Sequence, residues 1–181
     1  MNVWTIPNLI SFIRLLLVPV FLWLLFGKDD AAAAGWLLGV IGGTDWVDGY
    51  LARKLDQVSV VGEFLDPLAD RLAVGAAVIG GLVAGVLPPV FAIPLIAREG
   101  AMAIGALVVG VKAGTKLQVR WLGKLATLLL YYAIAAFFVG EGTPFDPLVW
   151  SAWVVGVPGL VIYYVVAVQY FGDARRIVAG E

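Results

Sequence analysis

Six long apolar segments, separated by short breaks that hold polar residues, Gly or Pro, account for most of the chain. They span residues 7–26, 31–55, 58–86, 89–111, 120–139 and 147–171. A helix needs about 20 apolar residues to cross the hydrocarbon core of a bilayer, and every segment reaches that length. The pattern therefore predicts an all-α integral membrane protein with six transmembrane helices, folded as one domain over residues 1–181.

The composition supports a protein that resides in lipid and restricts its chemistry. The chain is 62% hydrophobic and 14% charged, whereas soluble domains are about 45–50% apolar and about 25% charged. Cys and His are absent from the sequence, which excludes thiol nucleophiles, imidazole bases and zinc sites built from Cys or His. The formal net charge of −1 provides no basic excess, so we expect no nucleic-acid partner.

Lysine and arginine are distributed unevenly between the two predicted sides of the membrane. The breaks after the first, third and fifth segments contain one cation, Lys28. The opposite side contains seven cations: Arg53, Lys54, Lys112, Lys116, Arg120, Arg175 and Arg176. Because cytoplasmic loops are enriched in Lys and Arg, we expect a multi-pass protein of the cell (inner or plasma) membrane with both termini in the cytoplasm.

Charged residues inside the apolar segments are the strongest functional candidates, because a charge in lipid is unfavourable and rare. Asp45 and Asp48 lie in the second segment, about 60° apart around a helix. Asp66 and Asp70 lie in the third segment at an i, i+4 spacing and so share a face. The break at 56–57 is too short to separate the two helices. We therefore expect the four carboxylates to converge at the cytoplasmic ends of neighbouring helices.

Four carboxylates held close together in a poor dielectric repel one another, so they require protons or a cation. Oxygen ligands suit a hard divalent ion, and this set suits two Mg²⁺ or Mn²⁺ ions about 4 Å apart, as in phosphoryl transfer. Gly49 and Ala52 keep one helix face thin enough for a flat ligand, and Arg53 is placed to bind phosphate oxygens. The alternative is a structural network in which the aspartates pair with Arg53 or Arg71.

These residues, in this order and spacing, resemble a known family signature. The pattern Asp45-x2-Asp48-Gly49-x2-Ala52-Arg53-x8-Gly62-x3-Asp66-x3-Asp70 matches that of the CDP-alcohol phosphotransferase family at all eight specified positions. The resemblance implies an enzyme with an active site facing the cytoplasm, which releases CMP without a covalent enzyme intermediate. It implies two divalent metals bound by Asp45, Asp48, Asp66 and Asp70, with Asp70 as the base that deprotonates the acceptor hydroxyl. The residues implied to bind the nucleotide and its diphosphate are Asp48, Gly49, Ala52, Arg53 and Gly62.

Two further stretches resemble the bacterial phosphatidylglycerophosphate synthase and cardiolipin synthase branch of that family. They are Ile6-Pro7-Asn8-Leu9-Ile10 with Arg14, and Gly123-Lys124-x2-Thr127. The resemblance implies transfer of a phosphatidyl group from CDP-diacylglycerol to glycerol 3-phosphate, the acceptor that we expect first, or to phosphatidylglycerol. The phosphate of glycerol 3-phosphate requires a cationic site, for which the candidates are Arg98, Lys116, Arg120, Lys124 and Arg175.

Simpler explanations stand beside these expectations. The positive-inside bias and binding of anionic lipid head groups also explain cytoplasmic cations, and Arg98 has an adjacent acid in Glu99. A cation-coupled transporter is a more distant alternative, because acidic clusters in membrane helices also mark ion paths. Such transporters usually contain inverted repeats, and the sequence contains no evident repeat.

Small residues along the third and fourth segments allow close helix packing, and the family resemblance implies a homodimer.

Overall fold

The computed structural model describes residues 6–55, 60–113, 121–141 and 146–179, and it leaves out side chains near several helix ends, including 45–55 and 60–68. The described ranges contain six α-helices and one π-helical turn. In chain order these elements are α1 (Ile6–Leu22), η1 (Trp23–Gly27), α2 (Ala31–Leu55), α3 (Val60–Val83), α4 (Pro89–Ala113), α5 (Trp121–Glu141) and α6 (Asp146–Ala179). The all-α class predicted from the sequence is therefore confirmed for these residues.

The ends of the observed helices agree with those of the apolar segments to within three residues, except at the C-terminal end. The sixth segment was expected to end at residue 171, but α6 continues to Ala179. Its last turns include Asp173, Arg175 and Arg176. A hydropathy pattern marks only the apolar part of a helix, so it does not detect a polar extension.

Local chemistry explains the two short connections that the structure describes. Asp30 caps α2, because its Oδ1 accepts a hydrogen bond from the backbone N–H of Ala33 at 2.8 Å. Gly85 has a φ of +78° after the end of α3, a left-handed conformation that glycine adopts without a steric penalty. Pro89 begins α4, at a position where its missing N–H leaves no helical hydrogen bond unmade.

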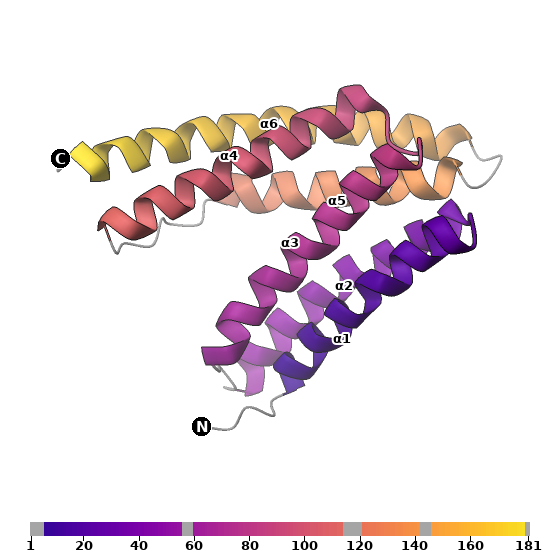
Figure 1. The fold of residues 1–181 in the computed structure, drawn as a ribbon, viewed down its shortest axis with the longest axis horizontal. Coiled ribbons are helices and arrows are strands. Elements are labelled where there is room, and N and C mark those ends of the chain that lie inside the picture. Colours follow the sequence, from indigo (N-terminus) through magenta and orange to yellow (C-terminus); the bar gives the residue numbers. More distant parts are fainter. Residues whose placement is uncertain (1–5, 56–59, 114–120, 142–145, 180–181) are drawn as a thin grey trace.

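The helices form two groups of three, α1–α3 and α4–α6, that meet at one end and diverge towards the other (Figure 1). The connections at 28–30 and 84–88 lie at the joined end. Packing of α2 against α5 and of α3 against α4 links the groups. The end of α2 and the start of α3 lie at the diverging end (Figure 1), so the fold places both halves of the signature there.

Aromatic side chains form much of the core near the joined end. The ring centroids of Phe21 on α1 and Phe138 on α5 lie 5.4 Å apart. Phe137 on α5 lies 5.2 Å from Phe91 on α4 and 5.3 Å from Trp153 on α6. These separations are typical of favourable tilted and edge-on aromatic contacts, so α1, α4, α5 and α6 share one packed core.

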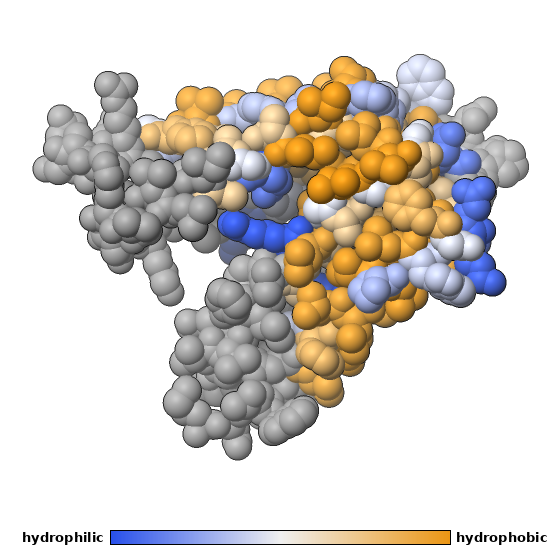
Figure 2. All heavy atoms as spheres, viewed as in Figure 1, coloured by the Kyte–Doolittle hydropathy of each residue, from blue (hydrophilic) through white to orange (hydrophobic). Residues whose placement is uncertain are grey.

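Large apolar side chains also cover much of the outer face of the described helices (Figure 2). Trp36, Val83, Val90, Leu128 and Trp150 are all exposed. Soluble monomers rarely expose contiguous apolar surface on this scale. The exterior is therefore that of a chain that lies in a membrane.

Three described helical stretches are long and apolar enough to cross a bilayer. They are Leu9–Gly27, Trp121–Glu141 and Pro147–Gly172. α2, α3 and α4 each contain ionisable residues within apolar sequence. Six transmembrane helices and cytoplasmic termini therefore remain predictions. The apolar exterior and these three stretches agree with a helical membrane protein.

Candidate active site

The signature divides between two helices, as its spacing predicts. Its first half lies on α2 and contains Asp45, Asp48, Gly49, Ala52 and Arg53. Its second half lies on α3 and contains Gly62, Asp66 and Asp70. Because the backbone is helical at all these positions, residues three or four apart within each half lie on one face.

The structure describes the side chain of one signature aspartate, Asp70. The other three, Asp45, Asp48 and Asp66, have side chains outside the described part, as does Arg53. Within the described residues, no group of three acidic side chains is close enough together to hold a metal ion. Convergence of the four carboxylates and the ligand roles of these residues therefore remain predictions.

Helix α1 supplies packing that the sequence did not predict. It packs against both α2 and α3, whereas few contacts among the described residues join α2 directly to α3. The side chains of Val18 and Phe21 on α1, Ile41 on α2 and Ala73 on α3 line one small internal space. Among the described residues, α1 therefore lies against both of the helices that carry the signature.

The best-defined polar contact at the site joins α1 to α3. Nη1 of Arg14 donates a hydrogen bond to Oδ1 of Asp70 at 2.5 Å, forming an ion pair. The Arg14 side chain is 1% exposed, and that of Asp70 is 44% exposed. A buried cation thus contacts the one described signature carboxylate, which keeps a substantial accessible surface. The sequence drew attention to Arg14 through the stretch that resembles the family branch, but it gave no indication that Asp70 is its partner.

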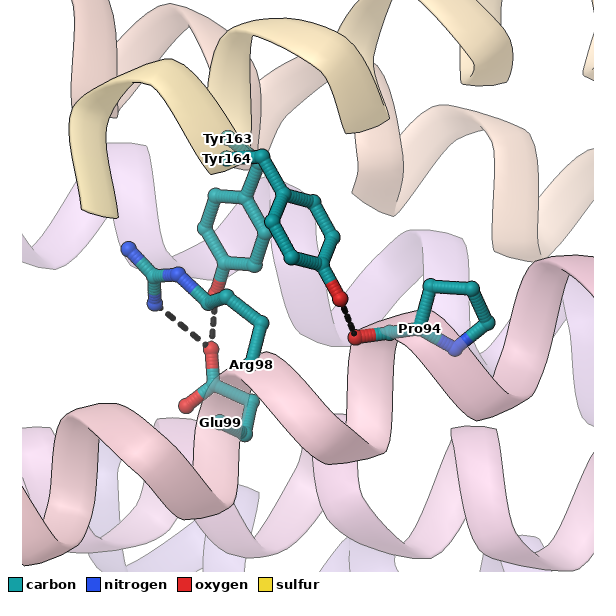
Figure 3. A network of polar contacts seen from close by, with 5 residues as sticks. All are labelled: Pro94, Arg98, Glu99, Tyr163 and Tyr164. Carbon is teal, nitrogen blue, oxygen red and sulfur yellow. Dashed lines mark hydrogen bonds and ion pairs between the residues drawn. The ribbon is translucent and has the colours of Figure 1, made fainter. Parts of the chain in front are cut away.

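A second polar cluster joins α4 to α6 (Figure 3). Oε1 of Glu99 accepts hydrogen bonds from Arg98, at 3.0 Å, and from the hydroxyl of Tyr163. The guanidinium carbon of Arg98 lies 3.6 Å from the centroid of the Tyr163 ring, which is a close cation–π contact. Beside this cluster, the hydroxyl of Tyr164 donates to the carbonyl of Pro94 at 2.8 Å. Adjacent tyrosines on α6 therefore make separate hydrogen bonds to α4.

This cluster fixes the position of the Arg98 side chain but does not provide an acceptor for all of its N–H groups. Its side chain is 10% exposed, and its Nε has no hydrogen-bond partner among the described residues. A buried donor without an acceptor is unfavourable in a folded protein, so the Nε–H of Arg98 favours a further acceptor. Arg98 thus pairs with Glu99, as the sequence allowed. Among the described residues, its Nε–H remains available to donate a hydrogen bond.

The structure describes only part of the other cations that were predicted to bind the acceptor. Lys124 is exposed on α5. Lys116 and Arg120 lie outside the described residues, and Arg175 lies on α6 with its side chain outside the described part. The structure therefore brings none of these four into a described contact with Arg98. Tyr163 was missed because a tyrosine in an apolar helix resembles an ordinary lipid-facing or core aromatic residue.

Comparison with known proteins provides independent information about the chain. Residues 4–167 match the family model for CDP-alcohol phosphatidyltransferase. The chain is 33% identical to a cardiolipin synthase (CMP-forming) of Streptomyces coelicolor, with 99% of this chain and 87% of the relative aligned. It is 35% identical to a CDP-diacylglycerol–glycerol-3-phosphate 3-phosphatidyltransferase of Bacillus subtilis, over 79% of this chain and 80% of the relative. A probable phosphatidylglycerophosphate synthase of Mycobacterium tuberculosis is 32% identical over 97% of this chain and 84% of its own length. With a family model covering most of its length and relatives aligned almost from end to end, the chain belongs to the CDP-alcohol phosphatidyltransferase family.

Proposed function

We propose that this protein is a phosphatidylglycerophosphate synthase, which transfers a phosphatidyl group from CDP-diacylglycerol to glycerol 3-phosphate and releases CMP. The observation that carries the proposal is the complete signature, divided between α2 and α3, in a chain of this family. Acidic residues in membrane helices are also compatible with a cation-coupled transporter, but membership of this family favours a transferase.

The reaction is one displacement at phosphorus. The primary hydroxyl oxygen of glycerol 3-phosphate attacks the phosphorus that carries the diacylglycerol, and the bond from that phosphorus to the bridging oxygen of CMP breaks. Asp70 accepts the hydroxyl proton, as a positioned carboxylate can in general base catalysis. Its accessible carboxylate suits this role, and the absence of Cys and His from the chain agrees with direct transfer.

Two divalent cations, Mg²⁺ or Mn²⁺, fit the donor set that we propose. Asp45, Asp48, Asp66 and Asp70 offer only carboxylate oxygens, the donors that these ions prefer. Asp70, the member whose side chain is described, has accessible surface. When bound, such ions neutralise the diphosphate and the charge that develops on the departing CMP.

The nucleotide site that we propose uses the same helix faces. Gly49, Ala52 and Gly62 leave room for the cytidine ring, and Arg53 and Asp48 contact the nucleotide and its diphosphate. The acyl chains of the donor remain in the bilayer while its head group enters the polar site. This division favours a site at the membrane interface over one at the midplane.

The acceptor site that we propose centres on Arg98, with Lys116, Arg120, Lys124 and Arg175 as further cations. The partly unsatisfied guanidinium of Arg98 supports binding of an anion at this cluster. The phosphate of glycerol 3-phosphate is such an anion, and Arg71 immediately follows the base Asp70 in sequence.

Cardiolipin synthesis is the second candidate, with phosphatidylglycerol as the acceptor. It is supported by the relative named cardiolipin synthase in Streptomyces coelicolor, which aligns with 99% of this chain. Phosphatidylglycerol is a lipid, so it would enter sideways from the bilayer. An acceptor groove open to lipid would then replace a water-facing basic site.

We also propose a single domain over residues 1–181, with six transmembrane helices, both termini in the cytoplasm and the active site at the cytoplasmic surface of the inner (plasma) membrane. The excess of Lys and Arg on one side supports this orientation. Small residues such as Gly75, Ala76 and Gly80 on α3 allow close helix packing. We propose that the protein forms homodimers in contact with membrane lipids.

One experiment tests the function and distinguishes the two acceptors. Purified protein in detergent receives CDP-diacylglycerol and either glycerol 3-phosphate or phosphatidylglycerol, with Mg²⁺ or Mn²⁺ present. We expect CMP release and phosphatidylglycerophosphate with the first acceptor, identified by mass spectrometry. Cardiolipin formed only with the second acceptor would establish the alternative, and the absence of CMP release with both would contradict the proposed function.

A further inference from the structure

Arg14 requires a physical explanation because it is a cation within a strongly apolar helix. α1 contains no other charged residue, and its sequence is otherwise almost entirely apolar. Arg14 is nevertheless among the most buried side chains of the described residues, on the same face as the buried Ser11 and Phe21. Charged residues retained inside membrane helices usually serve a functional site. The residue that Arg14 contacts therefore indicates what it does.

One contact of Arg14 is with the carboxylate to which we assign the proton transfer. Its Nη1 lies 2.5 Å from Oδ1 of Asp70, and these residues are separated by 56 positions in sequence. The Arg14 side chain is buried, whereas the Asp70 side chain is 44% exposed. The guanidinium thus contacts Asp70 from the protein interior, and the carboxylate keeps accessible surface on another side.

Joining α1 to α3 does not by itself require this ion pair. The two helices already pack through small and apolar residues, since Val18 and Phe21 on α1 share one internal space with Ala73 and Ala76 on α3. A buried ion pair often contributes little net stability, because desolvation of the charges offsets their attraction. Orientation of a reactive group is a better attested use of such a contact.

We propose that Arg14 is a positioning residue for Asp70. It holds the carboxylate at the α1–α3 contact in the orientation needed to accept a proton from the acceptor hydroxyl. It acts through Asp70 and contacts neither substrate. This inference rests on the proposed function, because it assigns Arg14 a role in the same reaction.

The kinetic test compares Arg14→Met, which removes the charge but keeps an unbranched apolar side chain, with Arg14→Lys, which keeps the charge but loses the planar fork. We expect Arg14→Met to lower kcat about tenfold to a hundredfold, as loss of an orienting partner commonly does, with both KM values changed less than about twofold. Arg14→Lys should recover part of the lost kcat. A kcat for Arg14→Met within about twofold of wild type would overturn the proposal.

A matched control separates positioning from loss of stability. Phe21→Leu removes core packing from the same helix, so it should lower the unfolding temperature while leaving kcat near the wild-type value. If activity instead follows unfolding temperature across Phe21→Leu and Arg14→Met, Arg14 has only a structural role and the proposal is wrong. Wild-type turnover with either acceptor is measured in parallel, so failure of the proposed function is recognised separately.

A second readout does not depend on activity. Unfolding temperatures are measured in detergent with chelator for wild type, Arg14→Met, Asp70→Asn and the double variant. Residues in direct contact have effects that do not add, so the double variant should differ from the sum of the two single shifts. Additive shifts would show that the two side chains are not coupled in the folded protein, and this would also overturn the proposal.

Discussion

Arg98 lies over the ring of Tyr163, with its guanidinium carbon 3.6 Å from the ring centroid. The two side chains also donate to the same carboxylate oxygen, Oε1 of Glu99 (Figure 3). Tyr163 thus contacts Arg98 directly through its ring and indirectly through Glu99. This arrangement restricts the guanidinium to one position between α4 and α6, so a flexible side chain becomes a fixed cation.

Replacing Tyr163 by Phe tests this arrangement, because the ring remains and only the hydroxyl is lost. We expect the free energy of unfolding to fall by about 1 kcal/mol, as for loss of one hydrogen bond. We also expect KM for glycerol 3-phosphate to rise by about threefold, corresponding to less than 1 kcal/mol of binding. Tyr164→Phe is the matched control, since it loses a bond to the Pro94 carbonyl and leaves Arg98 unchanged. An equal rise in acceptor KM for both variants would contradict the role of Tyr163.

Arg98→Ala should weaken acceptor binding selectively. Loss of a charged hydrogen-bonding group costs roughly 1.5–3 kcal/mol, so KM for glycerol 3-phosphate should rise by about tenfold to a hundredfold. The KM for CDP-diacylglycerol should change little. For Arg98→Lys, the KM for glycerol 3-phosphate should lie between the values for wild type and Arg98→Ala, because lysine keeps the charge but lacks the planar fork. Equal effects of Arg98→Ala on the two substrates would argue against an acceptor-phosphate site here.

Asp70→Asn should remove the proposed base while preserving the size of the side chain. General base catalysis contributes about 10²- to 10⁴-fold to rate, so kcat should fall within that range. Because asparagine, unlike alanine, keeps a carbonyl oxygen that can bind a divalent ion, binding of CDP in the presence of Mn²⁺, measured by calorimetry on the purified protein, should remain largely intact. A variant that retains nearly the wild-type rate would show that another group accepts the proton.

Asp45→Ala tests the assignment of the signature aspartates to divalent metals. Removing one carboxylate from the proposed donor set should abolish turnover together with Mn²⁺-dependent stabilisation, measured as a shift in unfolding temperature. Thr44→Val is a nearby control, because its hydroxyl donates within α2 to the carbonyl of Ile41 at 2.7 Å. Turnover by Asp45→Ala that needs no divalent ion would reject the two-metal scheme.

Two glycines on α2 test the packing of the fold without reference to activity. A Cβ added at Gly35 would lie 2.7 Å from Cβ of Phe138 and 2.9 Å from the backbone N of Val139 on α5. Gly35→Ala should therefore destabilise the protein by about 1–3 kcal/mol, as overpacking does. A Cβ at Gly39 meets nothing within 4 Å, so Gly39→Ala should be neutral or stabilise by up to about 1 kcal/mol. Thermal unfolding in detergent measures both, and the reverse order would contradict the α2–α5 contact.

Sequence patterns predicted the helices well, for a physical reason. Backbone groups in lipid must be hydrogen-bonded within the chain, so a long apolar segment has few alternatives to a helix. The Asp30 and Pro89 positions mark helix starts by local chemistry alone. The polar end of α6 was missed, because residues after 171 no longer differ from a loop in hydropathy.

The sequence by itself determined the signature, its division between two helices and the shared face of Asp66 and Asp70, because all of these follow from spacing along one helix. Only the tertiary structure decided that Arg14 contacts Asp70 and that Tyr163 contacts Glu99, pairs separated by 56 and 64 positions. Such contacts depend on which helix faces meet, and no local pattern encodes that choice. α1 packs against α3 and α6 against α4, and these packing choices selected the partners of the buried charges.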